Sequence, residues 1–150
     1  MVKEKDSVRF QRANFVVSDL AESYRFYCDV LGLTVTFEKE SKSDSYSYDV
    51  FEIDNSSALR FSILSTASQP RVMALTEVRE SRVGVEMLPR RSAIVLDVAD
   101  IDGIVYGAKA LGLKVYDESV LETHDGRCGR EVGIVDVDGN LVVIYHISIS

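Results

Sequence analysis

Several residue types and patterns that mark particular protein classes are scarce in this sequence. Its 150 residues contain only two cysteines, Cys28 and Cys128, which form no CxxC pair and predict no disulfide framework. No apolar run approaches the length of a membrane span. The charged segment 1–7 lacks the apolar core of a signal peptide, so we expect a cytoplasmic protein with no membrane partner.

Positive charge is scarce as well. There are 17 Lys and Arg residues against 24 Asp and Glu residues, which gives a formal net charge of −7. The nearest approach to a basic cluster is the pair Arg90-Arg91, and a negative surface repels the phosphates of nucleic acid. We therefore expect no nucleic-acid partner. The 46% of apolar residues is enough for the core of a single domain, residues 1–150.

Familiar catalytic motifs are also absent. The sequence holds neither a GxSxG nucleophile elbow nor a P-loop, and the Gly-rich segment 126–130 does not follow a GxGxxG pattern. It has only two histidines, His124 and His146, and we do not expect them to share a metal ion. Motifs therefore assign no catalytic residue, and the remaining evidence lies in how the chain is organised.

The most informative feature is an internal repeat. The segment Phe15–Leu20 resembles Val95–Ile101, because each is a short apolar stretch that reaches an aspartate and is followed by a helical pattern. The segment Leu31–Val35 matches Leu111–Val115, since both begin with Leu-Gly-Leu. Both pairs are offset by about 80 residues. The chain is therefore expected to consist of two similar modules.

Each repeat predicts one helix. Apolar residues recur at helical spacing after Asp19 and after Asp100, and each aspartate is placed to cap the first free N–H groups. Gly32 and Gly112 follow the two patterns and can adopt the left-handed conformation that ends a helix. We expect the first helix to run from about residue 20 to residue 31.

Three strands are expected after each helix. They are residues 33–40, 46–53 and 58–64 in the first half, and 113–116, 131–136 and 141–147 in the second. Each half thus reads β-α-β-β-β, an α+β fold with module one at about 10–65, a linker at 66–90 and module two at 91–147. The linker contains apolar residues, so it either packs outside the sheet, adds a strand near 83–87, or covers a pocket as a lid.

Two parts of the sequence resemble the vicinal oxygen chelate superfamily, which includes glyoxalase I, extradiol dioxygenases, fosfomycin-modifying enzymes and bleomycin-binding proteins. The residues that carry the resemblance are Val16–Leu20, Ser23, Phe26-Tyr27, Leu31–Leu33 and Val135–Val143. The last of these is similar to the family's closing hairpin, with Val137 in place of the usual proline. The resemblance implies a curved mixed sheet whose concave face forms a cup, with the helices on the outer face.

The resemblance also implies where metal-dependent members hold their ligands, typically His, Gln and Glu on the first and last strands of each half. The matching positions are Arg12, Ala93, Val143 and, on the strand 58–64, Phe61 or its neighbours Arg60 and Ser62. None of these side chains is a good ligand, and arginine has no lone pair to donate. The sequence therefore predicts that the family's metal site is missing and that no cofactor is held.

Strand alternation suggests which residues face the cup. The candidates for contact with a ligand are Arg12, Asn14, Tyr48, Arg60, Asp97 and Tyr145. A few polar groups on a largely apolar surface are typical of a small-molecule site. Arg12 and Asp97 have an alternative role, as a salt bridge that ties the two halves together. The face that Tyr48 occupies stays open at this point.

Three functions remain in competition. The first is a metal-independent protein that binds a small, partly apolar molecule in the cup. The second is a metal-independent enzyme in which Arg12 stabilises negative charge and Asp97 or Tyr145 transfers a proton. The third is a metal-dependent lyase or dioxygenase, as the resemblance implies by default. We also expect a homodimer, because open sheet edges invite pairing and family members commonly pair.

Overall fold

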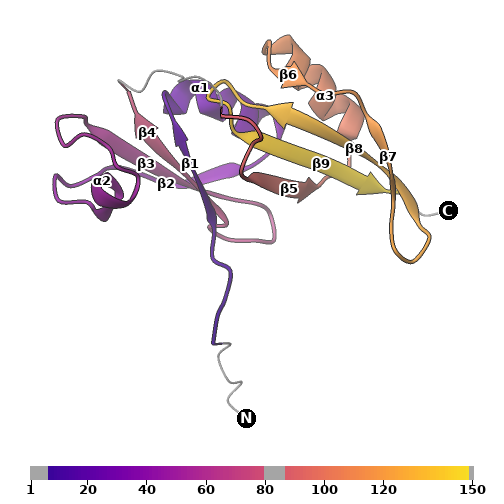
Figure 1. The fold of residues 1–150 in the computed structure, drawn as a ribbon, viewed down its shortest axis with the longest axis horizontal. Coiled ribbons are helices and arrows are strands. Elements are labelled where there is room, and N and C mark those ends of the chain that lie inside the picture. Colours follow the sequence, from indigo (N-terminus) through magenta and orange to yellow (C-terminus); the bar gives the residue numbers. More distant parts are fainter. Residues whose placement is uncertain (1–6, 80–86, 149–150) are drawn as a thin grey trace.

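The strands form two mixed sheets, one from each half of the chain (Figure 1). The computed structural model describes residues 7–79 and 87–148. Sheet A has the order β1 (Ala13–Val17), β4 (Met73–Val78), β3 (Leu59–Ser65), β2 (Thr34–Glu40). Sheet B has the order β5 (Ala93–Asp97), β9 (Leu141–Ile147), β8 (Cys128–Val135), β6 (Lys114–Val115), and β7 (Ser119–Glu122) also pairs with β8.

The two sheets repeat one plan. The first strand of each module lies parallel to the last, as β1 does to β4 and β5 does to β9, and the other pairs are antiparallel. A helical segment follows each first strand: α1 (Leu20–Tyr24) with the π-helix η1 (Arg25–Val30), and α3 (Ile101–Ala110). The predicted α+β fold with two related modules is confirmed.

The predicted helix ends are also confirmed. The Oδ1 atom of Asp19 accepts from the backbone N–H of Glu22 at 3.2 Å, and Oδ1 of Asp100 accepts from Gly103 at 2.9 Å. Gly32 and Gly112 follow the helices with φ of 86° and 77°. Each aspartate satisfies one free N–H group, and each glycine adopts a conformation that other residues rarely take.

The predicted strand at 46–53 is wrong. Its first part is the short helix α2 (Tyr46–Val50), which begins where Ser45 Oγ accepts from the backbone N–H of Ser47 at 3.3 Å. The alternating Ser-Tyr-Ser-Tyr sequence is equally compatible with a strand, but a serine can also cap a helix, as Ser45 does here. The last strand of module one is instead β4, which lies within the segment assigned to the linker. The strand expected near 83–87 falls almost entirely outside the described residues.

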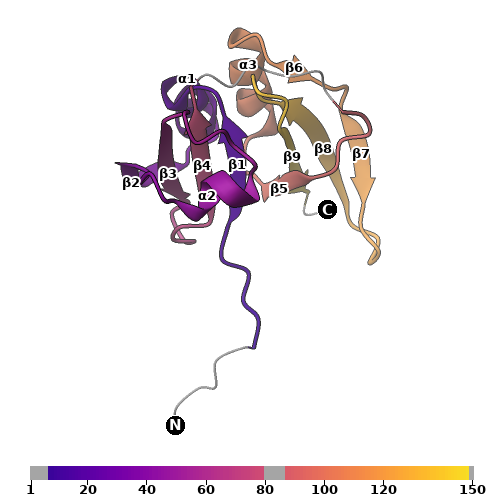
Figure 2. The same cartoon turned by 60° about the vertical axis from the view of Figure 1, so that its left-hand side comes forward.

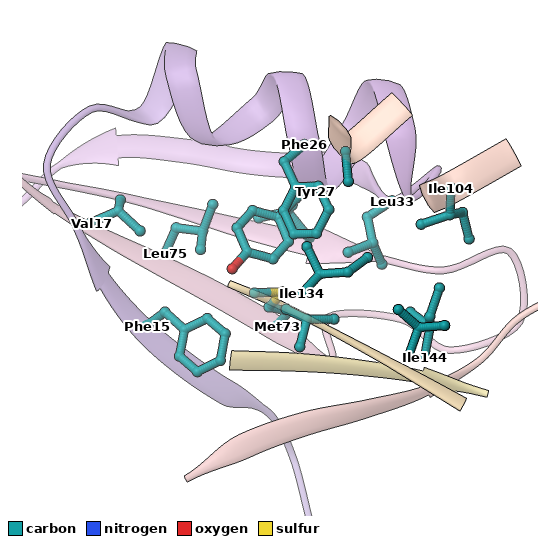
Figure 3. Close-up of a cluster of buried hydrophobic side chains, with 14 of the residues drawn as sticks. Phe15, Val17, Phe26, Tyr27, Leu33, Met73, Leu75, Ile104, Ile134 and Ile144 are labelled. Atoms are coloured by element: carbon teal, nitrogen blue, oxygen red, sulfur yellow. The ribbon is translucent and has the colours of Figure 1, made fainter. Parts of the chain in front are cut away.

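One apolar core joins the two modules (Figure 3). The helices α1, η1 and α3 cover one face of each sheet, and side chains from both halves meet beneath them. The members of this core include Phe15, Phe26, Tyr27, Leu64 and Leu75 from module one, and Ile101, Ile104, Ile134, Val142 and Ile144 from module two. Because the core is shared, the two modules fold as interdependent halves.

The opposite faces of the sheets are turned away from these three helices, and we call them the open faces. On sheet A the open face includes Asn14, Val16, Ala74 and Thr76, since their sequence neighbours lie in the core, and Phe61, which pairs with Thr76. On sheet B it includes Ala93, Val95, Asp97, Val143 and Tyr145. The helix α2 packs over one end of the open face of sheet A, as Figure 2 shows from the side.

The helices of the described residues were compared with the length and apolar character of a membrane span. No helix there combines enough length with enough apolar character to span a bilayer.

Candidate functional site

The open face of sheet B carries the clearest candidate site. Asp97 lies beside Tyr145 on the neighbouring strand, and Val95 lies beside Val143. The Val95 side chain is 61% exposed, while Tyr145 is half-buried and Asp97 is exposed. An apolar strip with one carboxylate and one phenol at its end can hold a small molecule and orient a polar group on it.

The open face of sheet A is more polar at its start. Asn14 accepts a hydrogen bond at its Oδ1 atom from Thr76 Oγ1 at 3.0 Å. Arg12 precedes β1, is exposed, and donates from Nε to the carbonyl oxygen of Arg71 at 3.4 Å. Among the ion pairs of the described residues there is none between Arg12 and Asp97, so the salt bridge proposed between the halves is wrong.

Tyr48 and Arg60 have structural partners. Tyr48 is buried in α2, packs against Leu59 and Val78, and donates from Oη to the carbonyl oxygen of Ser57 at 2.6 Å. Arg60 lies on the helix-covered face of sheet A, not on the open face, because its neighbours Leu59 and Phe61 occupy the latter. Both residues border a hollow of about 600 Å³ at one end of sheet A.

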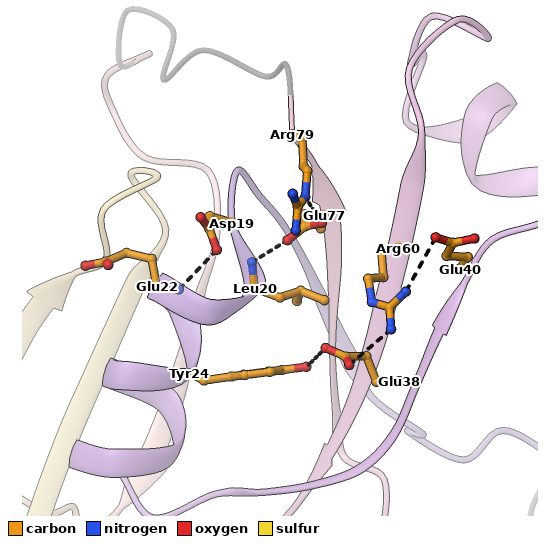
Figure 4. A network of polar contacts seen from close by, with 9 residues as sticks. All are labelled: Asp19, Leu20, Glu22, Tyr24, Glu38, Glu40, Arg60, Glu77 and Arg79. Atoms are coloured by element: carbon orange, nitrogen blue, oxygen red, sulfur yellow. Dashed lines mark hydrogen bonds and ion pairs between the residues drawn. The ribbon is translucent and has the colours of Figure 1, made fainter.

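A polar network around Arg60 fastens α1 to sheet A (Figure 4). Arg60 forms ion pairs with Glu38 at 3.3 Å and with Glu40 at 3.8 Å. Tyr24 donates from Oη to Glu38 at 2.7 Å. Burial raises the pKa of Tyr24, and the Tyr24 hydrogen bond lowers the pKa of Glu38. These groups satisfy one another, so the network is better explained by attachment of the helix than by catalysis.

Glu77 is a polar residue that the sequence analysis missed. It is buried at the end of β4, where Oε2 accepts from the backbone N–H of Leu20 at 2.6 Å and Oε1 accepts from Arg79 at 3.0 Å. Its carboxylate therefore satisfies the first residue of α1 (Figure 4). Glu77 and Thr76 were overlooked because their segment was assigned to the linker.

The positions that hold metal in the family can now be placed on the strands. Ala13 and Ile94 occupy equivalent places in the two modules. Ala13 pairs with Met73 in sheet A and Ile94 pairs with Val142 in sheet B, so Met73 is equivalent to Val142. The next residue along each strand gives Ala74 as the counterpart of Val143. The earlier assignment to Phe61, Arg60 or Ser62 is wrong, because β3 is not the last strand of module one.

With this one correction, the four metal positions are Arg12, Ala74, Ala93 and Val143, and none has a side-chain lone pair suited to a metal ion. Within the described ranges, no group of three or more His, Cys, Asp and Glu residues is arranged to hold a metal. His146 approaches the carbonyl oxygen of Val98 with Nδ1 at 2.8 Å. The residues present therefore do not fit the divalent metal that the fold implies.

The closing hairpin has a clear structural role. Asp136 is buried and accepts four hydrogen bonds: from Tyr27 Oη at 2.7 Å, from the backbone N–H groups of Asn140 and Asp138 at 2.8 and 2.9 Å, and from Asn140 Nδ2 at 3.0 Å. Tyr27 belongs to module one. Asn140 Nδ2 also donates to the carbonyl oxygen of Val16 at 3.2 Å. This cluster, which we call the inter-module clamp, joins the two halves.

The clamp predicts a pH dependence of stability. Burial raises the pKa of Asp136 above its usual value of 3.8, against the opposing effect of the hydrogen bonds it accepts. A carboxyl with a raised pKa in the folded state favours folding most when it is protonated. Relative to Asp136→Asn, the wild type should therefore lose stability as pH rises from below 3.8 through the raised pKa, and the difference should be constant above it.

Urea unfolding of both proteins across the acidic range, with carbon NMR titration of the Asp136 carboxyl, measures this effect. An Asp136 pKa below that of an unfolded-chain aspartate would contradict it.

Comparison with known proteins gives a consistent result. A model of the Glyoxalase/Bleomycin resistance protein/Dioxygenase superfamily matches residues 9–144. No curated protein sequence matches the chain. Among solved structures, a glyoxalase family protein from Bacillus cereus is similar with a TM-score of 0.70 and 16% identity, over 98% of each chain.

Two further structures show the same fold. A genomically encoded fosfomycin resistance protein from Listeria monocytogenes, in complex with Mn(II) and sulfate, is similar with a TM-score of 0.60 and 14% identity, over 99% of this chain and 96% of its own. The trypanothione-dependent glyoxalase I of Leishmania major is similar with a TM-score of 0.61 and 17% identity, over 93% of this chain and 87% of its own. At these identities the likeness concerns the fold alone.

Proposed function

This chain belongs to the glyoxalase/bleomycin resistance protein/dioxygenase superfamily, and on that premise we propose that it binds a small, partly apolar molecule without a metal ion. The observation that carries the proposal is the chemistry at the four positions that match the family's metal ligands. Arg12, Ala74, Ala93 and Val143 replace oxygen and nitrogen ligands by a fixed cation and three aliphatic groups. A surface of this kind attracts apolar ligand atoms and disfavours a divalent ion.

The open face of sheet B supports the proposal in more detail. Val95 is 61% exposed although it sits in the middle of a strand. A ligand laid along Val95 and Val143 would remove apolar surface from water, at about 25 cal/mol for each Å². Asp97 and Tyr145, at the end of the same strip, would fix the orientation of a polar group. Because no ion pair joins Arg12 to Asp97 among the described residues, we favour binding over a joint catalytic role for the two.

The test is a search for a bound molecule. Protein purified under non-denaturing conditions is examined by native mass spectrometry, and a fragment set is screened by NMR. We expect a saturable ligand whose binding is lost in Val95→Asp and kept in Val120→Asp, a matched change at an exposed position on β7. If neither method finds a saturable ligand, or if both variants behave alike, the proposal is wrong.

We predict that the protein holds no stoichiometric Zn, Ni, Fe or Mn. The reason is that dehydrating the ion would go uncompensated next to Ala74, Ala93 and Val143. Elemental analysis after dialysis should find much less than one metal per chain, and a chelator should leave the melting temperature unchanged. About one bound metal per chain, lost in Asp97→Ala, would restore the metal-dependent enzyme.

We also propose that the chain forms a homodimer. The strands β1, β2 and β5 lie at sheet edges in the described structure, and unprotected edges favour association. Sedimentation at micromolar concentration should give twice the chain mass of 16.7 kDa. A single species at the monomer mass would contradict this prediction.

A further inference from the structure

A mostly apolar hollow of about 340 Å³ lies between the two modules. Module one contributes the segment before β1, the beginning of β1 and of β4, the connection between β3 and β4, and Leu33. Module two contributes four consecutive residues of β5, Ala93–Leu96. Because consecutive residues of a strand point to opposite faces, a wall made of all four runs along the edge of β5. The hollow is therefore distinct from the open faces, although Ala93 and Val95 border both.

In the described part of the chain, no strand pairs with the edge of β5 that meets the hollow. In sheet B, β5 is an outermost strand, with β9 as its partner. The backbone N–H of Val98 donates to Tyr145 on β9 at 2.9 Å. Since successive N–H groups of a strand alternate between its two edges, the N–H of Val95 points away from β9. The hollow thus receives a backbone donor.

The side chains around the hollow restrict the ligand further. None of the residues that line it is charged, and the only polar side chains are those of Thr66 and Gln69. Thr66 Oγ1 accepts from the backbone N–H of Gln69 at 2.9 Å, while no hydrogen bond of Gln69 Nε2 occurs within the described part of the chain. Phe10 and Met73 lie on the wall, and aromatic rings and thioether sulfur both favour contact with an aromatic ligand.

We propose that this hollow is a second binding site, which takes a small, neutral aromatic molecule that carries a carbonyl oxygen. Its volume falls in the range of known ligand sites, and its lining is apolar with a few donors, as such sites require. The ring lies against Phe10 and Met73, and the oxygen accepts from Gln69 Nε2. A carboxylate is disfavoured because it would lose its hydration on entering the hollow, and the lining has no cation to pair with it.

Three probes of similar size test the chemistry. Acetophenone has the ring and the carbonyl, ethylbenzene has the ring alone, and benzoate carries a charge. Titrations followed by two-dimensional NMR of the full chain should show saturable shifts at Gln69, Val95 and Leu96. Acetophenone should bind roughly five-fold more tightly than ethylbenzene, the value of one hydrogen bond. Benzoate should cause no saturable shift.

Two variants locate the site. Ala93→Phe should fill the hollow and weaken acetophenone at least ten-fold, whereas Val120→Phe, which places the same aromatic ring on the exposed β7, should have no effect. Gln69→Ala, in an exposed connection, should reduce acetophenone to the affinity of ethylbenzene and leave ethylbenzene unchanged. Equal affinities for the three probes, no saturation, or shifts on the open faces that Ala93→Phe leaves intact would each overturn the proposal. The last of these results would still be compatible with the function proposed above.

Discussion

Replacing Asp136 with alanine is expected to lower the free energy of unfolding by about 4 kcal/mol, a large part of what an ordinary domain has. The carboxyl group accepts from Tyr27 Oη, from two backbone N–H groups and from Asn140 Nδ2, and it is buried. Its removal leaves these donors without an acceptor in a place that water reaches poorly. The loss also separates Tyr27 from the hairpin, so the effect extends to the contact between modules.

Chemical denaturation of wild type and Asp136→Ala measures the loss. Asp54→Ala is the matched control, because Asp54 also accepts from the backbone N–H two residues along, from Ser56 at 2.8 Å, but is exposed. We expect a much smaller effect there. Asp136→Asn should be intermediate, since its amide keeps one acceptor oxygen. Equal stabilities of Asp136→Ala and Asp54→Ala would show that the inter-module clamp does not form.

The repeat made most of the architecture predictable. Local features determine the helix ends, because Asp19 and Asp100 cap their own first turns and Gly32 and Gly112 follow the last. The family resemblance implied a mixed sheet, while the parallel pairing of first and last strands is seen only in the structure. These elements could be placed because short segments carry enough information to define them.

The failures involve information that a single segment does not contain. The residues Tyr46–Val50 alternate like a strand but form a helix, in which Tyr48 packs against Leu59 and Val78 from other parts of the chain. The strand β4 is buried along its whole length, so it shows no alternation, and a long apolar connector looks the same in sequence. Because β4 is the last strand of module one, the metal position assigned to β3 falls on Ala74 instead. Alanine is no better as a metal ligand, so the expectation of a missing metal site does not change.

The candidate site was predictable in part. Asp97 and Tyr145 do lie side by side, as strand alternation suggested. Tyr48 and Arg60 are occupied by structural partners that come from elsewhere in the chain, Ser57 and Glu38. The role of Asp136 was hidden for the same reason, since its partner Tyr27 is 109 positions away. Long-range partners decide whether a polar residue is free to bind a ligand.

The second large effect is expected at Gly129, where substitution by valine should lower the unfolding free energy by about 3 kcal/mol. Gly129 is buried on β8 and lies beside Ile147 on β9. A Cβ atom there would overlap the carbonyl oxygen of His146 and lie 3.0 Å from the Cα atom of Ile147. Both are backbone atoms of the paired strand, so the strands would have to separate and lose hydrogen bonds at this end of the sheet.

A thermal melt should show Gly129→Val unfolding about 10 °C below the wild type. Gly133→Ala is the control on the same strand, since the nearest atom to its Cβ would be Cδ2 of the Tyr116 ring at 3.3 Å. That ring is 41% exposed and can turn aside, and alanine reduces the freedom of the unfolded chain. Gly133→Ala should therefore melt near the wild type. If Gly129→Val does so too, β8 and β9 do not approach each other as closely as the structure shows.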